Sequence, residues 1–110
     1  MMPPLTPAEA RELADAGQIT LLDVRELAEV QASGLAKGAV HIPLAMIPLR
    51  ANRQAPDHDP LLDPAKPVAV YCAAGARAGR AADLLASLGY AAHNIGGFAD
   101  WCAAGGEVER

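Results

Sequence analysis

The chain has 110 residues, enough for one compact domain with its own core and too few for two, so we expect a single domain over residues 1–110. Apolar residues make up 52% of it and include 25 alanines, which predicts an aliphatic, closely packed core and excludes a disordered chain. A net charge of −4 and only one Phe, two Tyr and one Trp exclude the basic face and stacking surface that nucleic-acid binding needs.

The sequence shows no membrane-spanning or export signal. No apolar run approaches the ~18 residues of a spanning helix, and residues 1–4 lack the basic and then apolar order of a signal peptide. We therefore expect a cytoplasmic protein that binds no membrane. In a reducing compartment Cys72 and Cys102 are each a buried apolar residue or a reactive thiol, and their number does not decide between the two.

Helix and strand signals alternate along the first half. Thr6-Pro7-Ala8-Glu9 has the spacing of a capping box with proline at the first helical position, which predicts a helix over 7–15. An apolar run that ends in polar residues predicts a buried strand over 19–22. Further elements are predicted in chain order: a short helix over 26–32, a strand over 39–42 and a weak helix over 44–51.

The second half begins with a loop and continues with strand, turn and helix. Four prolines and three aspartates predict a surface loop over 52–67. The later elements are predicted as a strand over 68–71, a helix over 78–88, a strand over 92–95 and a short helix that carries Phe98 and Trp101. This alternation predicts an α/β fold with a central parallel sheet flanked by helices on both faces.

Ligands of such sheets gather beyond the carboxyl ends of the strands. After the strand over 68–71 this position holds the segment Cys72-Ala73-Ala74-Gly75-Ala76-Arg77. A thiol between a strand end and a helix start faces unpaired N–H groups and the positive end of the helix dipole, and both favour the thiolate. Gly75 permits positive φ, so that N–H groups turn inward around the sulfur. We expect the Cys72 thiol to be exposed there.

The charges around Cys72 support a site for an anion. No acidic residue lies between 72 and 82, so Arg77 and Arg80 give this segment a local charge of +2. An arginine at a helix N-terminus opposes the helix dipole, and anion binding explains its presence. In the alternative interpretation, Cys72 is an inert core residue and Arg80 pairs with Asp83 one turn on.

Four segments of the chain form a recognisable series. They are Leu21-Leu22-Asp23-Val24-Arg25 followed by Glu29, Gly38-Ala39-Val40-His41-Ile42-Pro43, the loop 72–77, and Gly96-Gly97-Phe98-Ala99-Asp100-Trp101. With these segments in this order, the chain resembles a single-domain rhodanese, a sulfurtransferase, over about residues 19–105. Similar phosphatase and arsenate-reductase domains have five residues between Cys and Arg, whereas this chain has four, which favours sulfur chemistry.

The resemblance implies a two-step transfer. The Cys72 thiolate takes the outer sulfur of a small anionic donor such as thiosulfate, becomes a persulfide, and passes the sulfur to a thiol or cyanide-like acceptor. The loop N–H groups would hold the terminal sulfur, and Arg77 with Arg80 would receive the anionic end of the donor. No metal or organic cofactor is implied. A non-catalytic sulfur-carrier or protein-binding module stays open as the alternative, and a phosphate or arsenate enzyme ranks last.

Several residues have more than one interpretation. Many relatives carry polar side chains where this chain has Ala73, Ala74 and Ala76, so we hypothesise an open mouth suited to a bulky protein or small-molecule persulfide. Asp23 is expected to orient the loop, and Arg25 either does the same or forms a surface pair with Glu26 or Glu29. We expect Cys102 in the core, and no zinc site, because His41, His58 and His93 lack ligand spacing.

Overall fold

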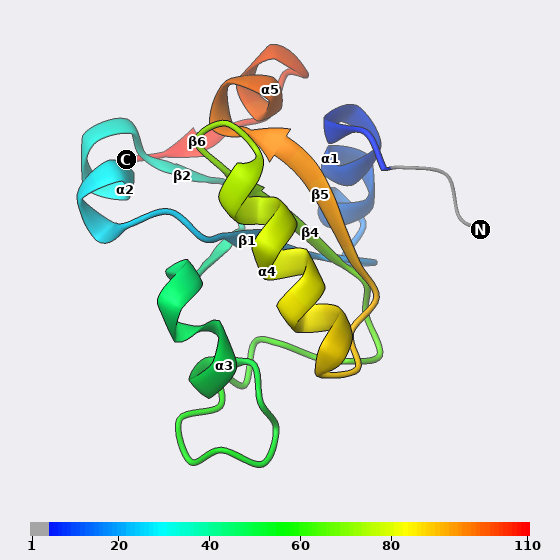
Figure 1. Ribbon diagram of the computed structural model, residues 1–110. Coiled ribbons are helices and arrows are strands. Elements are labelled where there is room, and N and C mark those ends of the chain that lie inside the picture. Colours follow the sequence, from blue (N-terminus) through cyan, green and yellow to red (C-terminus); the bar gives the residue numbers. More distant parts are fainter. Residues whose placement is uncertain (1–4) are drawn as a thin grey trace.

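The computed structural model describes residues 5–110 and contains a four-stranded, fully parallel sheet with the strand order β3-β1-β4-β5 (Figure 1). The strands are β1 (Thr20–Asp23), β3 (Val40–His41), β4 (Val68–Cys72) and β5 (Ala92–Gly97). The helices are α1 (Pro7–Asp15), α2 (Leu27–Ser33), α3 (Ile47–Arg50), α4 (Ala76–Ser87) and α5 (Phe98–Ala103), with a 3-10 turn η1 (Leu44–Met46).

Helices cover both faces of this sheet, as the sequence predicts. Side chains of β4 alternate between the faces: Val70 packs toward α3 and α4, whereas Tyr71 packs toward α1 and α5. Both faces of β4 are buried, which explains its unbroken apolar sequence. On the first face α4 contributes Ala78 and Ala81, whose small side chains let the helix lie close to the strands.

Local signals fix most element boundaries. The capping box of Thr6 and Glu9 is present, and α1 spans the predicted residues 7–15. Helix α4 begins at Ala76, two residues earlier than predicted, because Gly75 adopts φ +103° and acts as its N-cap. None of the helices within residues 5–110 is long and apolar enough to cross a membrane.

A second, small sheet was not predicted. Strands β2 (Leu35–Ala36) and β6 (Val108–Glu109) pair antiparallel near the C-terminal end. Two-residue strands have no periodicity that a sequence pattern could show. Their pairing depends on Gly34, which has φ +93° and lies so close to Val108 that a Cβ there would have no room. The segment between β1 and β3 is thereby held next to the C-terminal residues.

The loop over 52–67 contains no helix or strand, as predicted, but it is anchored at two points. Leu62 is buried in the core, and the Asp59 carboxylate accepts a hydrogen bond from Arg50 at 3.0 Å. The predicted surface loop therefore contains one buried carboxylate, because Asp59 lies against an arginine of α3.

The burial of both faces of the sheet predicts that truncating a buried leucine destabilises the protein far more than truncating an exposed one. Leu22 in β1 is fully buried, so Leu22→Ala should lower the free energy of unfolding by about 2–5 kcal/mol through lost packing and a residual cavity. Leu27 is 56% exposed at the start of α2, and Leu27→Ala should change it by no more than about 0.5 kcal/mol. Urea denaturation of both variants measures this difference, and equal losses would contradict the assigned burial.

Candidate active site

Cys72 is the last residue of β4, and the turn that follows folds over its sulfur. The Sγ atom accepts hydrogen bonds from the Gly75 N–H at 2.9 Å and from the Ala78 N–H at 3.3 Å. The expectation of an exposed thiol is wrong, because only 1% of Cys72 is accessible beneath the loop. The sulfur nevertheless contacts backbone donors at the start of α4, which is an environment suited to negative charge.

The loop over Cys72 rests on two glycines of β5. A Cβ at Gly97 would collide with the carbonyl of Ala73, and a Cβ at Gly75 would be in ordinary contact with Gly96. Any side chain at position 97 would therefore push the loop away from the sulfur. The outer side of the loop consists of Ala73, Ala74 and Ala76, which are all exposed.

Asn94 ties the loop to β5, a role that sequence analysis missed. Its Nδ2 donates to the Gly75 carbonyl at 2.9 Å, and its Oδ1 accepts from the Gly96 N–H at 2.9 Å. The two bonds fix the backbone of Gly75, whose own N–H points at Sγ. An asparagine at the end of a predicted strand was the one available signal, and it does not reveal which loop the side chain reaches.

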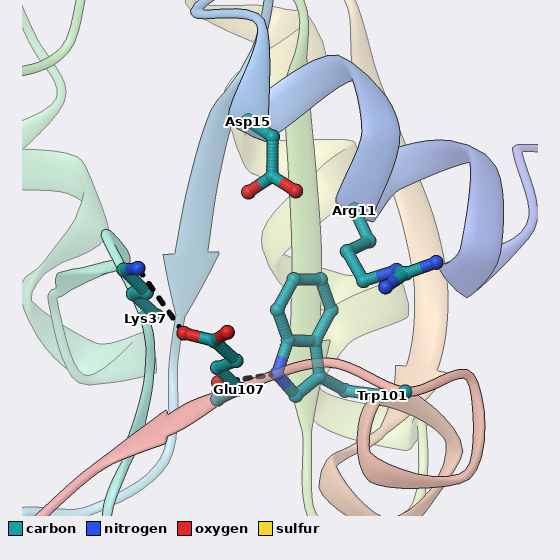
Figure 2. A pocket seen from close by; sticks show the side chains of 6 residues that line it. Arg11, Asp15, Lys37, Trp101 and Glu107 are labelled. Atoms are coloured by element: carbon teal, nitrogen blue, oxygen red, sulfur yellow. Dashed lines mark hydrogen bonds and ion pairs between the residues drawn. The ribbon is translucent and has the colours of Figure 1, made fainter.

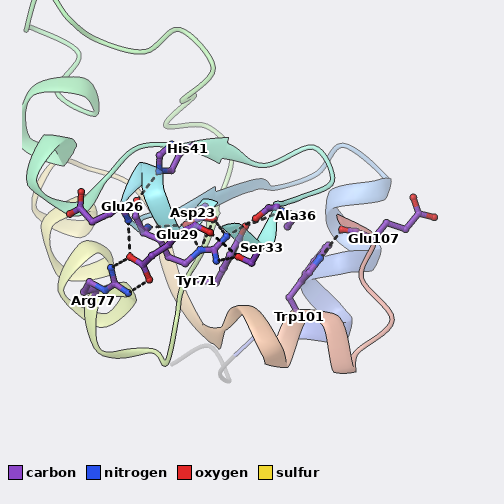
Figure 3. Close-up of polar contacts among 12 residues, drawn as sticks. Asp23, Glu26, Glu29, Ser33, Ala36, His41, Tyr71, Arg77, Trp101 and Glu107 are labelled. Atoms are coloured by element: carbon purple, nitrogen blue, oxygen red, sulfur yellow. Dashed lines mark hydrogen bonds and ion pairs between the residues drawn. The ribbon is translucent and has the colours of Figure 1, made fainter. Parts of the chain in front are cut away.

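Arg77 does not contribute a free positive charge. Its guanidinium forms two hydrogen bonds with the Glu29 carboxylate, Nη1 to Oε1 at 2.6 Å and Nη2 to Oε2 at 2.9 Å (Figure 3). These bonds lower the pKa of Glu29 from 4.5 to about 2 and raise the pKa of Arg77. The expected local charge of +2 is therefore wrong, since α2 brings a carboxylate from far away in the sequence. Arg80 is exposed and has no salt bridge within residues 5–110.

Asp23 and Arg25 form a buried ion pair at the carboxyl end of β1. Arg25 donates from Nη2 to Asp23 Oδ2 at 2.8 Å, and the two residues are 3% and 0% exposed. The expectation of a surface pair with Glu26 or Glu29 is wrong, because the arginine side chain turns inward and its guanidinium lies 4.3 Å from the centre of the Phe98 ring.

Arg25 also fixes the end of α2. It donates to Ser33 Oγ and to the Gly34 carbonyl, both at 2.7 Å. Since α2 carries Glu29, the buried pair is connected to the Cys72 loop through this helix and the Glu29–Arg77 bonds. No hydrogen bond within residues 5–110 runs directly from Asp23 to the loop. Asp23 is therefore connected to the loop only indirectly, through Arg25 and helix α2.

Cys102 differs in location from the sequence prediction. It is exposed rather than in the core, because Trp101 is the residue of the short helix α5 that faces the sheet and Cys102 is rotated away from it. His41 has a structural role: its Nε2 donates to the Arg25 carbonyl at 2.7 Å and so supports the end of β1.

Comparison with known proteins gives a single family. The model of the rhodanese-like domain matches residues 6–104, so the chain belongs to the rhodanese-like domain family. A protein named sulfurtransferase from Allochromatium vinosum is 33% identical over 81 residues, which is 74% of this chain and 67% of that protein.

Solved structures agree with this assignment of the fold. A rhodanese-related protein from Thermoplasma volcanium is 27% identical with a TM-score of 0.78, over 98% of each chain. A protein of unknown function from Rhodopseudomonas palustris, described as a possible tyrosine phosphatase, is 30% identical with a TM-score of 0.85, over 98% of this chain and 85% of that one.

The Asn94 bonds predict a measurable effect on the loop. Asn94→Ala should speed hydrogen exchange of the Gly75 amide by about two- to tenfold, because losing one hydrogen bond lowers the free energy of local opening by ~0.5–1.5 kcal/mol. NMR of the exchanging amide measures the rate. Asn52→Ala, in the distant surface loop, is the matched control, and an equal acceleration in both variants would contradict the role of Asn94.

The Glu29–Arg77 pair predicts a pH-dependent contribution to stability. Because the pKa of Glu29 is lower in the folded protein, the pair stabilises it above pH 4.5, and this contribution is lost as the pH falls from 4.5 toward 2. Both side chains are about one-third exposed, so the contribution is at most about 1 kcal/mol. The urea midpoints of wild type and Glu29→Gln should differ at neutral pH and converge on acidification; a difference that grows toward acid pH would contradict this assignment.

Proposed function

We propose that this protein is a sulfurtransferase that carries a sulfane sulfur as a persulfide on Cys72. The proposal rests on one observation: Sγ lies at the carboxyl end of a parallel strand and accepts two backbone N–H groups at the start of α4. Such donors stabilise a negatively charged sulfur, both the free thiolate and the terminal atom of a persulfide. Membership of the rhodanese-like domain family and the relative named sulfurtransferase support the same chemistry.

The transfer proceeds in two displacements at sulfur. The Cys72 thiolate attacks the outer sulfur of a donor such as thiosulfate; a new S–S bond forms, the old one breaks, and its electron pair leaves with sulfite. A nucleophilic acceptor, a thiolate or cyanide, then attacks the terminal sulfur, and the bond pair returns to Cys72 as thiolate. Both steps balance without a metal or an organic cofactor.

The two arginines near Cys72 have different roles, and the alanines of the loop leave space for a donor. Arg80 is exposed and unpaired within residues 5–110, so it is the arginine that would attract an anionic donor, whereas Arg77 holds the loop against Glu29. The exposed methyl groups of Ala73, Ala74 and Ala76 leave room around the loop. We propose that a bulky protein or small-molecule persulfide is the donor that this surface suits best.

Two observations favour a second candidate function. Only 1% of Cys72 is accessible, and the charge of Arg77 is neutralised, so a non-catalytic module that binds a partner or carries sulfur is also compatible with the site. Phosphate chemistry has less support. Four residues separate Cys72 from Arg77, one fewer than in the similar phosphatase domains, and the guanidinium faces Glu29.

The persulfide gives the decisive test. After incubation with thiosulfate or with a thiol-bound persulfide, the intact mass should increase by one sulfur atom, and cyanide or a thiol should remove it. Cys72→Ser should show no increase, and sulfur transfer to cyanide should fall by at least about a thousandfold, as it does when a covalent nucleophile is removed.

Cys102→Ser is the matched control, because this exposed thiol lies outside the loop and should leave the added mass and the rate unchanged. An unchanged mass with every donor would support the non-catalytic module. Hydrolysis of a phosphate ester that depends on Cys72 would instead support the phosphatase interpretation. Full transfer by Cys72→Ser would rule out the mechanism.

A further inference from the structure

A cavity of about 300 Å³ lies between α1, the segment after β2, α5 and the C-terminal residues (Figure 2). No residue of the Cys72 loop lines it. The lining residues are Arg11, Asp15, Lys37, Trp101, Gly105 and Glu107. Two cationic and two anionic side chains therefore surround an indole ring in one small space.

The four charged groups differ in how firmly they are paired. Lys37 Nζ and the Glu107 carboxylate form an ion pair of 3.1 Å, but the side chains are 60% and 72% exposed, so the pair is weak. Arg11 and Asp15 lie one turn apart on α1 and form no salt bridge within residues 5–110. Arg11 and Asp15, one positive and one negative group, thus line this cavity without an ion-pair partner among the residues that the structure describes.

Arg11 provides a second observation that points to a ligand. Its side chain is half-buried and forms no hydrogen bond or salt bridge within residues 5–110, and its Nε is buried as well as unpartnered. A charged donor left unpaired in such a place is costly. The Nη1 atom lies next to Gly105, which lines the same cavity, so the terminal nitrogens are the donors that a carboxylate there could reach.

Trp101 contributes a small apolar surface to the cavity, because only 2% of the residue is exposed. Its Nε1 already donates to the Glu107 carbonyl at 3.0 Å, and the ring packs against Gly106, where a Cβ would collide with it. The ring is therefore held rigidly, with its only polar atom used. A small aliphatic group of a ligand is the part that suits this wall.

From this geometry we propose that the cavity binds a small zwitterion of the α-amino-acid class. Its carboxylate pairs with Arg11, its ammonium group pairs with Asp15, and a short aliphatic side chain lies against Trp101. A simple anion would be repelled by Asp15 and Glu107, and a simple cation by Arg11 and Lys37. This site is independent of the sulfur chemistry proposed for Cys72.

The single tryptophan of the chain makes the proposal directly measurable. Titration with L-valine into the millimolar range should change the Trp101 fluorescence saturably and shift the indole N–H resonance. N-acetyl-L-valine lacks the ammonium charge and L-valinamide lacks the carboxylate, so each should require at least about tenfold more ligand, the effect of losing one charge-assisted bond. Cys72→Ser should bind L-valine unchanged.

Variants on α1 separate a specific site from a general effect on fluorescence. Arg11→Gln and Asp15→Asn should each raise the half-saturating L-valine concentration at least about tenfold. Glu12→Gln lies on the same helix outside the cavity and is the matched control, which should bind as wild type does. Asp15 is exposed, so Asp15→Asn tests the proposal even if Arg11→Gln fails to fold. Absence of saturation by L-valine, or equal binding of the N-acetyl derivative, would overturn the proposal.

Discussion

The buried ion pair of Asp23 and Arg25 is the interaction on which the rest of the site depends. It closes the carboxyl end of β1, and through Ser33 and Gly34 it fixes the end of α2. Helix α2 in turn presents the carboxylate that holds the arginine of the Cys72 loop. Removing one member of a buried pair leaves an uncompensated charge and typically costs ~3–5 kcal/mol. We therefore expect the position of the loop and the stability of the fold to be coupled.

The main features of the fold could be predicted because they depend on local signals. The capping box at Thr6 gives the start of α1, and the continuous apolar run before Cys72 gives β4 and the parallel sheet. The placement of the cysteine at a strand end and of Gly75 in the turn before the helix follows from the same patterns, although the helix begins two residues earlier than predicted. These elements needed no information about distant residues.

Features that depend on tertiary partners could not be predicted. The sequence around Arg77 contains no acid, and its carboxylate partner comes from a helix 48 residues away. The same holds for the pairing of β2 with β6 and for the contact of Asn94 with Gly75. Periodicity assigned Cys102 to the core and left Cys72 exposed, because a pattern gives the direction of a side chain and not what covers it.

The atoms that contact the Cys72 sulfur belong to the main chain, whereas the outward surface of the same turn is made of methyl groups. In the proposed sulfur transfer, the donors to sulfur and the surface that meets a partner are thus different parts of the loop. Exchanges at Ala73, Ala74 or Ala76 that keep the backbone path can alter which partner fits without changing the donors to sulfur. Homologous proteins can in this way diverge in specificity through a few surface replacements while retaining one reactive centre.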